Sequence, residues 1–509
     1  MYFTRLLLAF AAFETFATFG NCIPAPAPCD CNLQSDNNLH VEIGTSTLTG
    51  FINSSAPSVR QFLGVPYSLP PIGVRRWLPP SKLQKNGSLI ATSIGPVCPQ
   101  LLLTDQHPVN TSVFAPGAGN QTEFFPLQAN FSEDCLTLNV WTPRNQKNLL
   151  PVIVWFFGGG FTQGGTNSLY FNPQSWVQRT QEHIVVSVNF RSNIFGFPNA
   201  AGLGDQNLGL LDQRLALEWV RDNIAHFGGD PSRIISWGES AGAIAVDYID
   251  FAYPLDPIVS GRIMASGTAL FAPQYQRQTG DFAQNNFKAV AKAHGCGSAS
   301  SQVECLRNVS WQEIERHLAT AEGQTFTFLP IADEKLVFSN YSQRYEMDAL
   351  SSIPAIVGTN QHELNALAVE NAAIEYNNIL SPLTNSSFLC TAAATSRLRE
   401  ATCRTTYRYR YDGNFSNISP GIYTGAYHAS ELPLIFGTAG EYHGESAADE
   451  ELVSRKLQDL WLVFAKDPEE GLKNAGWNSY GAGKALLIGS GNSTIKEINV
   501  SRLDYVCNL

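Results

Sequence analysis

The chain has 509 residues, of which 44% are hydrophobic and 15% are charged. This composition is typical of a globular protein and excludes a disordered, collagen-like or coiled-coil chain. Acidic residues outnumber basic residues by 44 to 33, which gives a formal net charge of −11. Nucleic acid is not expected as a partner, because binding it depends on clustered positive charge.

The first twenty residues have the layout of a secretory signal. Arg5 precedes an apolar stretch over residues 6–13, and small residues follow as far as Gly20. We expect a signal over 1–20, a segment containing proline and cysteine over 21–39, and one domain over 40–509. No later stretch approaches about 18 uninterrupted apolar residues, so we expect no membrane span and a secreted, extracellular product.

Cysteines and glycosylation sequons agree with an oxidising compartment. Some of the ten cysteines lie close in sequence, namely Cys98 with Cys135, Cys296 with Cys305, and Cys390 with Cys403. No cysteine has metal-like spacing with histidine, and the sequence predicts neither a metal nor an organic cofactor. The partners of four cysteines stay open: Cys22, Cys29, Cys31 and Cys507. The sequons begin at Asn53, Asn86, Asn110, Asn120, Asn130, Asn308, Asn340, Asn385, Asn414, Asn417, Asn492 and Asn499.

The secondary-structure pattern predicts a doubly wound α/β domain. After a hairpin around 40–52, near-continuous apolar runs indicate buried parallel strands. The runs cover residues 152–157, 184–189, 234–237 and 355–357. A helix is expected over 209–227, and strand, helix, strand implies a right-handed crossover.

The rest of the chain is expected to be mostly helical. We expect a helical segment over 281–325, an irregular helical insertion over 363–411, a helix over 447–464 and a short strand over 485–488. The fold prediction is a mostly parallel central sheet with helices on both faces and helical caps.

The motif G-E-S-A-G over residues 238–242 follows an apolar strand and precedes a helix. A strand that turns abruptly into a helix strains the corner residue, here Ser240, and the flanking glycines let the turn close. The helix start directs backbone N–H groups towards the serine oxygen. A similar run over 444–448 has no preceding strand, so Ser446 is expected to cap a helix.

Three consecutive glycines, Gly158, Gly159 and Gly160, follow another buried strand. Glycines allow backbone N–H groups to approach a reacting carbon closely. This loop is the candidate for stabilising an oxyanion formed next to Ser240.

Several longer motifs resemble one family. They are F-L-G-V-P-Y over 62–67, S-E-D-C-L-T-L-N-V-W over 132–141, and the run from Asn207 to Arg233 with G-E-S-A-G after it. In this order they are similar to the type-B carboxylesterase/lipase family, which includes the cholinesterases, and to its secreted fungal type. The resemblance covers most of the chain after residue 40 and implies the α/β-hydrolase fold and a carboxylic ester hydrolase.

The resemblance implies that Ser240 is the nucleophile, that the N–H groups of Gly159, Gly160 and Ala241 form the oxyanion hole, and that Glu239 lines the pocket. The histidine should follow the acid in the chain. G-A-Y-H-A-S-E over 425–431 is similar to the family's histidine loop and points to His428. His443, in an acidic stretch, is interpreted as a surface histidine.

The motif V-G-T-N-Q-H-E over 357–363 resembles the family's strand-end loop and points to Glu363 as the acid. The family usually has glycine next, whereas Leu364 stands here, so Asp333 and Glu334 remain alternatives. Ser266 matches a position that hydrogen-bonds the acid. The pairs Cys98–Cys135 and Cys296–Cys305 also match the family's disulfide loops.

The loop between Cys98 and Cys135 separates the candidate functions. It has no tryptophan to hold a quaternary ammonium, which disfavours a cholinesterase. Its leucines and phenylalanines would suit the lid of an interfacially activated lipase, but its sequons argue against insertion into lipid. The sequence favours an esterase for short to medium acyl esters. A non-catalytic member of the family is disfavoured because every triad residue is present. The sequence predicts no oligomeric state.

Overall fold

The computed structural model describes residues 39–83, 87–100, 130–271, 284–367, 380–419, 425–442, 444–491 and 493–507. Residues 38–509 form one compact unit. The expected secretory signal, nearly all of the segment over 21–39, His443 and the apolar stretch over 101–129 lie outside the described residues. Within the described ranges, no helix is both long enough and apolar enough to cross a bilayer.

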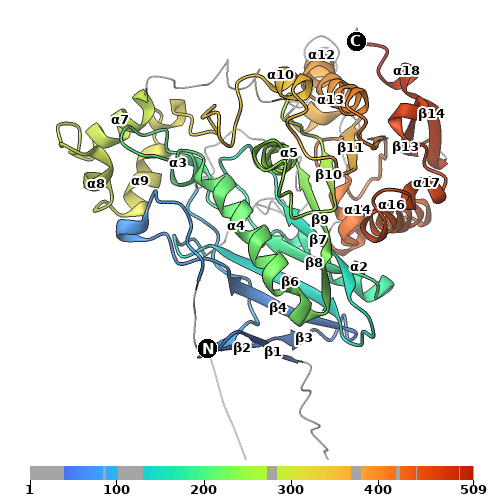
Figure 1. Cartoon of the computed structure of the whole chain (residues 1–509), viewed down its shortest axis with the longest axis horizontal. Coiled ribbons are helices and arrows are strands. Elements are labelled where there is room, and N and C mark those ends of the chain that lie inside the picture. The colour runs from blue at the N-terminus through green and yellow to red at the C-terminus, as the bar shows by residue number, and fades with distance from the viewer. Residues whose placement is uncertain are drawn as a thin grey trace, which may run out of the picture. The chain divides into compact units, whose positions relative to one another are not determined.

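The strands belong to two sheets. They are β1 (His40–Ile43), β2 (Ser46–Thr49), β3 (Phe51–Ile52), β4 (Val59–Pro66), β5 (Gly87–Ile90), β6 (Thr137–Pro143), β7 (Leu150–Phe156), β8 (Ile184–Val188), β9 (Gly229–Glu239), β10 (Gly261–Ala265), β11 (Ala355–Asn360), β12 (Thr406–Tyr411), β13 (Lys484–Ser490) and β14 (Ser493–Asn499). In the described chain, 11 strands form the large sheet, in the order β14-β13-β12-β11-β10-β9-β7-β8-β6-β4-β3 (Figure 1). The strands from β13 to β8 run parallel, and those at both edges run antiparallel. The small sheet has the order β1-β2-β5.

Helices cover both faces of the large sheet (Figure 1). The α-helices are α2 (Gln174–Thr180), α3 (Asn193–Gly196), α4 (Leu208–Asn223), α5 (Ala241–Ala252), α7 (Asn285–Ala293), α8 (Gln302–Leu306), α9 (Trp311–Leu318), α10 (Tyr341–Glu346), α12 (Ser381–Thr384), α13 (Cys390–Ala401), α14 (Leu432–Phe436), α15 (Ala439–Tyr442), α16 (Ala448–Lys466), α17 (Gly471–Asn474) and α18 (Val500–Leu503). The 3-10 turns are η2 (Gly73–Arg75), η3 (Leu169–Phe171), η4 (Ile224–Phe227), η5 (Gly323–Thr325), η6 (Glu363–Leu367) and η9 (Tyr480–Ala482), and η8 (Asn385–Leu389) is a π-helical turn.

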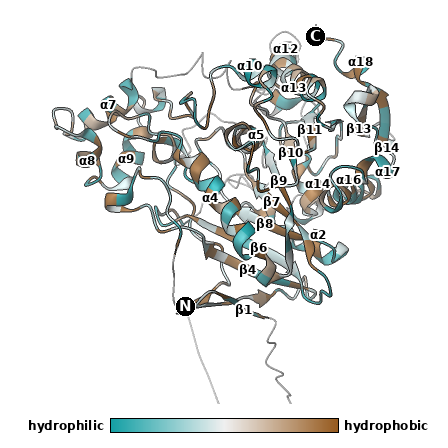
Figure 2. Cartoon of the chain, viewed as in Figure 1, coloured by the Kyte–Doolittle hydropathy of each residue, from teal (hydrophilic) through white to brown (hydrophobic). Residues whose placement is uncertain are grey.

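Alternate residues of β9 show that the two helical layers lie on opposite faces, because successive strand side chains point in opposite directions. The Trp237 ring contacts Phe436 of α14 and Trp461 of α16. The neighbouring Ser236 lies beside α4 and α5, with Leu217 and Val246 next to it. Figure 2 shows hydrophobic strands between helices that alternate hydrophobic and hydrophilic residues. This architecture is the α/β-hydrolase arrangement expected from the sequence.

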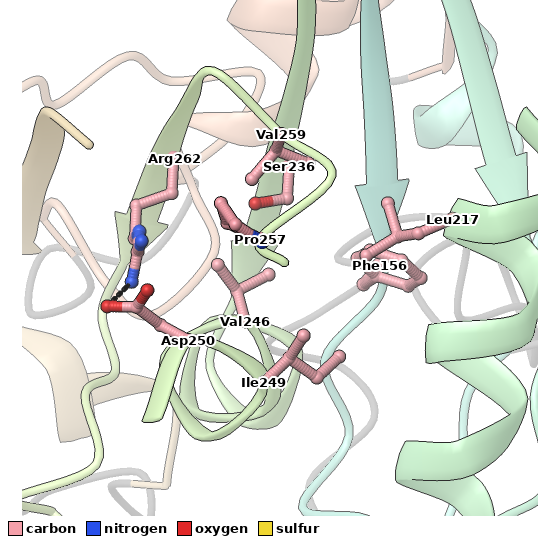
Figure 3. A pocket seen from close by; sticks show the side chains of 9 residues that line it. All are labelled: Phe156, Leu217, Ser236, Val246, Ile249, Asp250, Pro257, Val259 and Arg262. Carbon is pink, nitrogen blue, oxygen red and sulfur yellow. Dashed lines mark ion pairs between the residues drawn. The ribbon is translucent and has the colours of Figure 1, made fainter. Parts of the chain in front are cut away.

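A buried ion pair joins α5 to β10 beneath the sheet. Asp250 of α5 pairs with Arg262 of β10, and both side chains are almost fully buried. Figure 3 shows this pair at the edge of a cavity of about 10 Å³, which has room for about one water molecule. The pair fixes α5 against the strand next to β9.

Most of the predicted elements are present, with one clear error. The four apolar runs are β7, β8, β9 and β11, and the expected helix is α4 followed by η4. The irregular insertion predicted over 363–411 is wrong in its last part, because residues 406–411 form the central strand β12. The strand was not recognised because its sequence, T-Y-R-Y-R-Y, contains two arginines, which are typical of an exposed segment. Arg408 is nevertheless fully buried, because its guanidinium donates hydrogen bonds to the Val357 and Tyr409 carbonyls.

Disulfides join Cys98 to Cys135 and Cys296 to Cys305, the two pairs that the family resemblance implied. The suggested pair Cys390 with Cys403 is wrong, because Cys390 is bonded to Cys507. Cys390 begins α13 and Cys403 lies beyond its end at Ala401. The helix alone spans about 16 Å at 1.5 Å per residue, which is far beyond disulfide reach. Cys403 is an exposed free cysteine.

Candidate active site

Ser240 is the corner residue between β9 and α5. Its backbone has φ of 54° and ψ of −124°, a conformation that side-chain-bearing residues rarely adopt. A Cβ added to Gly238 would lie 2.3 Å from the carbonyl carbon of Gly242, and one added to Gly242 would lie 2.1 Å from the Phe156 carbonyl oxygen. Both glycines are therefore required for the turn that presents Ser240.

The start of α5 adds an electrostatic element to this corner. Ala241 is the first residue of the helix, and first-turn N–H groups have no acceptor within the helix. These groups and the positive end of the helix favour negative charge nearby. The Ala241 N–H is one of these first-turn groups, next to Ser240 in the chain.

The glycine run follows β7, the strand next to β9. A Cβ on Gly158 would lie 2.3 Å from Glu239 Oε2 and 2.9 Å from Ser240 Cβ. Gly159 and Gly160 have φ of 112° and 65°. Glycine is needed here because the loop passes directly against the Ser240 turn with positive φ angles.

His428 and Glu363 lie in hydrogen-bond contact with Ser240 and with each other. His428 Nε2 is 2.8 Å from Ser240 Oγ, and His428 Nδ1 is 2.7 Å from Glu363 Oε2. Glu363 Oε1 accepts the Asn360 N–H at 2.7 Å. The Glu363 side chain is fully buried, whereas that of His428 is 23% exposed. The structure therefore brings together the three residues selected from the sequence.

The alternative acid Asp333 has a different role in the structure. Its Oδ1 accepts the backbone N–H groups of Lys335, Leu336 and Val337, and its Oδ2 accepts the Asn207 side-chain amide. These bonds make it the centre of a tight turn. Glu334 is exposed and accepts the Ser339 N–H.

Ser446 does not cap α16 as expected. The N-cap residue is Ala447, whose N–H donates to Glu450 Oε2 at 3.2 Å, and Ser446 lies one residue earlier. No strand precedes it, since α15 ends at residue 442. The second G-E-S run thus has a different structural setting from Ser240.

Three buried carboxylates surround the imidazole of His428. Glu239 Oε1 lies 3.0 Å from Nε2, the same atom that faces Ser240 Oγ. Burial raises the pKa of the Glu239 carboxyl to about 8 and that of Glu431 to about 7. Burial also lowers the pKa of His428, but the charge of Glu239 and the hydrogen bond with Glu363 outweigh it and raise the pKa to about 9.

Two residues near the site were not singled out from the sequence. Asn360 donates from Nδ2 to Glu431 Oε2 at 2.5 Å, and to the Tyr427 carbonyl at 2.7 Å. Asn360 belongs to V-G-T-N-Q-H-E and Glu431 ends G-A-Y-H-A-S-E, so the motifs contained both. Ser266 differs from expectation, because its buried Oγ has no hydrogen-bond partner among the described residues. Both Glu363 oxygens are occupied instead by Asn360 and His428.

The described residues contain no cluster of three or more histidine, cysteine or acidic side chains arranged to hold a metal ion. The polar groups at Ser240 are a hydroxyl, an imidazole, carboxylates and backbone N–H groups. This set can carry out proton transfer and nucleophilic attack.

Residues 37–378 match the family model described as the carboxylesterase family. The chain belongs to this family. It is therefore a carboxylic ester hydrolase, as the sequence motifs indicated. A protein named chlorogenic acid esterase from Aspergillus niger is 39% identical over 508 residues, which cover 95% of this chain and 96% of that protein.

Two further members of the family carry the name lipase. Secreted lipase 5 of Gibberella zeae is 40% identical over 482 residues, covering 87% of this chain and 89% of the relative. Lipase 4 of Diutina rugosa is 32% identical over 333 residues, covering 61% of this chain and 60% of the relative.

The carboxylates around His428 predict a pH effect. Replacing Glu239 by Gln removes a negative charge next to Nε2, so the imidazolium is less favoured and the pKa of His428 falls. The acid limb of kcat/KM should move to lower pH by about one unit, since neutral His428 is required as base. Glu445→Gln, in the exposed second G-E-S run, is the matched control and should leave the limb unchanged. A shift to higher pH in Glu239→Gln would contradict this electrostatic account.

The hydrogen bonds of the two candidate acids predict distinct costs. Glu363→Gln should lower kcat by about 10⁴-fold, as removal of a triad carboxylate does in serine hydrolases. Asp333→Asn keeps an acceptor oxygen in its turn and should reduce kcat by less than about tenfold. Steady-state kinetics on p-nitrophenyl butyrate measures both. A larger loss of kcat in Asp333→Asn than in Glu363→Gln would indicate that Asp333 is the acid of the triad.

Proposed function

We propose that this carboxylesterase hydrolyses short to medium acyl esters through an acyl-enzyme with a Ser240–His428–Glu363 triad. The observation that supports the triad is the continuous set of contacts from Glu363 through His428 to Ser240, with 2.7 Å and 2.8 Å at its two links. Such contacts are the geometric signature of an activated nucleophile.

The first half of the reaction acylates Ser240. His428 Nε2 takes the Oγ proton as Oγ attacks the ester carbonyl, while Glu363 orients and stabilises the imidazolium through Nδ1–H. The oxyanion receives hydrogen bonds from the N–H groups of Gly159, Gly160 and Ala241. Collapse of the tetrahedral intermediate transfers the proton from His428 to the departing alcohol.

The second half releases the acyl group. Water enters where the alcohol left, and His428 takes its proton as the oxygen attacks the acyl carbon. The second intermediate breaks to the carboxylic acid, and the proton returns to Ser240. The three carboxylates near His428 stabilise the imidazolium in both halves, so activity should increase as pH rises and the free imidazole loses its proton.

A lipase is the second candidate. The names of the relatives described as lipases support it, and the relative named chlorogenic acid esterase supports an esterase instead. A non-catalytic member of the family is disfavoured because all three triad residues and both oxyanion glycines are present. We favour the esterase, because sequons begin at Asn110, Asn120 and Asn130 and glycans there would oppose contact with lipid.

We further propose that the protein is a secreted glycoprotein. Relatives named as secreted, and disulfides that persist in oxidising compartments, support secretion. Asn414 is exposed and accessible to glycosylation. Asn417 is buried, and its Nδ2 donates to the Ala439 carbonyl at 3.0 Å, so a glycan on that nitrogen is incompatible with the fold.

The decisive test is Ser240→Ala in the full secreted protein. Hydrolysis of p-nitrophenyl acetate, butyrate and octanoate, and of chlorogenic acid, should fall at least about 10³-fold, because the hydroxyl supplies the nucleophile. The thermal midpoint should stay close to that of the original protein. Ser446→Ala is the matched control and should retain activity. Equal loss in both variants, or none in Ser240→Ala, would sink the proposal.

Rate against tributyrin concentration separates the two candidates. An esterase should show simple saturation across the solubility limit, because it acts on dissolved substrate. A lipase should show a sharp rise above the limit, where an apolar surface is buried at the interface. A sharp rise would favour the lipase over the esterase as the function, and it would not affect the proposal of the triad.

A further inference from the structure

A phenylalanine covers one side of the His428 imidazole. Phe388 lies on η8, and its ring centroid is 5.1 Å from that of His428 at an interplanar angle of 60°. The Phe388 side chain is almost buried, and Phe271 packs on it with centroids 5.0 Å apart. Both pairs are tilted contacts at close ring distance, and such contacts favour particular relative orientations of the rings. Phe388 therefore restricts the position of the imidazole.

The turn that carries Phe388 is unusual. η8 is a π-helical turn between α12 and α13. Such turns are rare in proteins and occur frequently at functional sites. A turn of this kind needs support from its surroundings to persist.

Support comes from elements about a hundred residues or more downstream, from β13 to Cys507. Cys390, two residues after Phe388, is bonded to Cys507 across a sequence separation of 117. Around this bond, one buried cluster joins the start of α13 to β13, β14 and α18 (Figure 1). Its buried members are Leu389, Ala393, Ala485, Ile498, Leu503 and Cys507.

We propose that the Cys390–Cys507 disulfide holds Phe388 against His428 and so positions the imidazole between Glu363 and Ser240. Phe388 is a positioning residue in this account, and the disulfide acts through it. The inference rests on the proposed triad. It assigns a function in catalysis to the elements from β13 to Cys507, none of which contributes a triad residue.

The position of Phe388 has an electrostatic consequence. The groups that face His428 are Glu239 from β9, Glu363 from η6, Glu431 at the start of α14 and the Ser240 hydroxyl. Burial lowers the pKa of His428 against the effect of the carboxylates. If Phe388 moves away, water reaches the imidazole and weakens its interactions with the three carboxylates, which together raise its pKa above the ordinary value. The pKa then falls towards the ordinary value, in the same direction as expected for Glu239→Gln.

The test compares two disulfide deletions in the full chain. Cys390→Ser with Cys507→Ser removes the bond next to Phe388. Cys296→Ser with Cys305→Ser is the matched control, and it removes the bond that joins the loop after α7 to α8. Phe388→Ala removes the ring with the disulfide intact, and Phe388→Tyr restores a ring. kcat and KM for p-nitrophenyl butyrate are measured against pH, together with the thermal midpoint.

We expect Phe388→Ala and the Cys390/Cys507 variant to lower kcat by roughly tenfold, because small displacements of a catalytic group are costly. Both should move the acid limb to lower pH by about half a unit, because water at His428 weakens the effect of the carboxylates. Phe388→Tyr should restore the original limb. The Cys296/Cys305 variant should keep both kcat and the limb, even if its thermal midpoint falls.

Several results would overturn the inference. One is a folded Cys390/Cys507 variant with the original kcat and acid limb, and another is an unchanged limb in Phe388→Ala. If that double variant is not secreted, dithiothreitol is used to reduce the disulfide in the folded protein, being itself oxidised to its cyclic disulfide. Activity that disappears only together with the folded state would then show that the bond serves stability alone.

Failure of the proposed triad has a different signature. A wild-type protein that hydrolyses no ester and whose Ser240 is not labelled by a fluorophosphonate would refute the triad. A labelled, active wild-type protein with unresponsive Phe388 and disulfide variants would refute only the positioning by Phe388.

Discussion

The close approach of the loop after β7 to the turn after β9 is the constraint on which the site depends. β7 and β9 are neighbouring parallel strands, so their carboxyl ends meet at one edge of the sheet. Gly158 passes so near Ser240 and Glu239 that a single added carbon would overlap them. In the proposed mechanism, the backbone N–H groups of the same loop stabilise the oxyanion. The close packing at Gly158 and the proposed chemistry therefore both favour glycine in this loop.

The buried carboxylates make the free energy of unfolding and the proposed activity depend on pH in opposite directions. Glu239 and Glu431 have pKa values raised to about 8 and about 7 in the folded protein, above the ordinary value of 4.5. The folded state therefore binds more protons than the unfolded state, and the stability from these groups is lost as pH rises through that range. In the proposed mechanism, His428 becomes the base only when it loses its proton, at a pH near its pKa of about 9. A working pH must balance these two trends.

Local physics explains which features could be predicted from the sequence. The runs that became β7 and β8 are rich in valine and isoleucine, whose burial needs no distant information. Ser240 and the glycines were evident because a tight turn and a close approach exclude other residues. β12 was missed because an arginine such as Arg408 is typical of the surface, and its burial depends on the Val357 carbonyl of β11 and the Tyr409 carbonyl of β12. Phe388 and Cys507 depend on contacts between segments far apart in sequence, which no local pattern contains.

The bond between Cys390 and Cys507 also has a consequence for synthesis of the chain. At about 5–20 residues per second, Cys507 is made roughly 6–23 s after Cys390, because 117 residues separate them. Cys403, 403 − 390 = 13 residues after Cys390, appears within about 1–3 s at the same rate. Cys403 is therefore available to Cys390 before the native partner Cys507 is. An α13 formed at this stage would hold Cys390 and Cys403 beyond disulfide reach, and so would protect the native pairing until β13, β14 and α18 have been made.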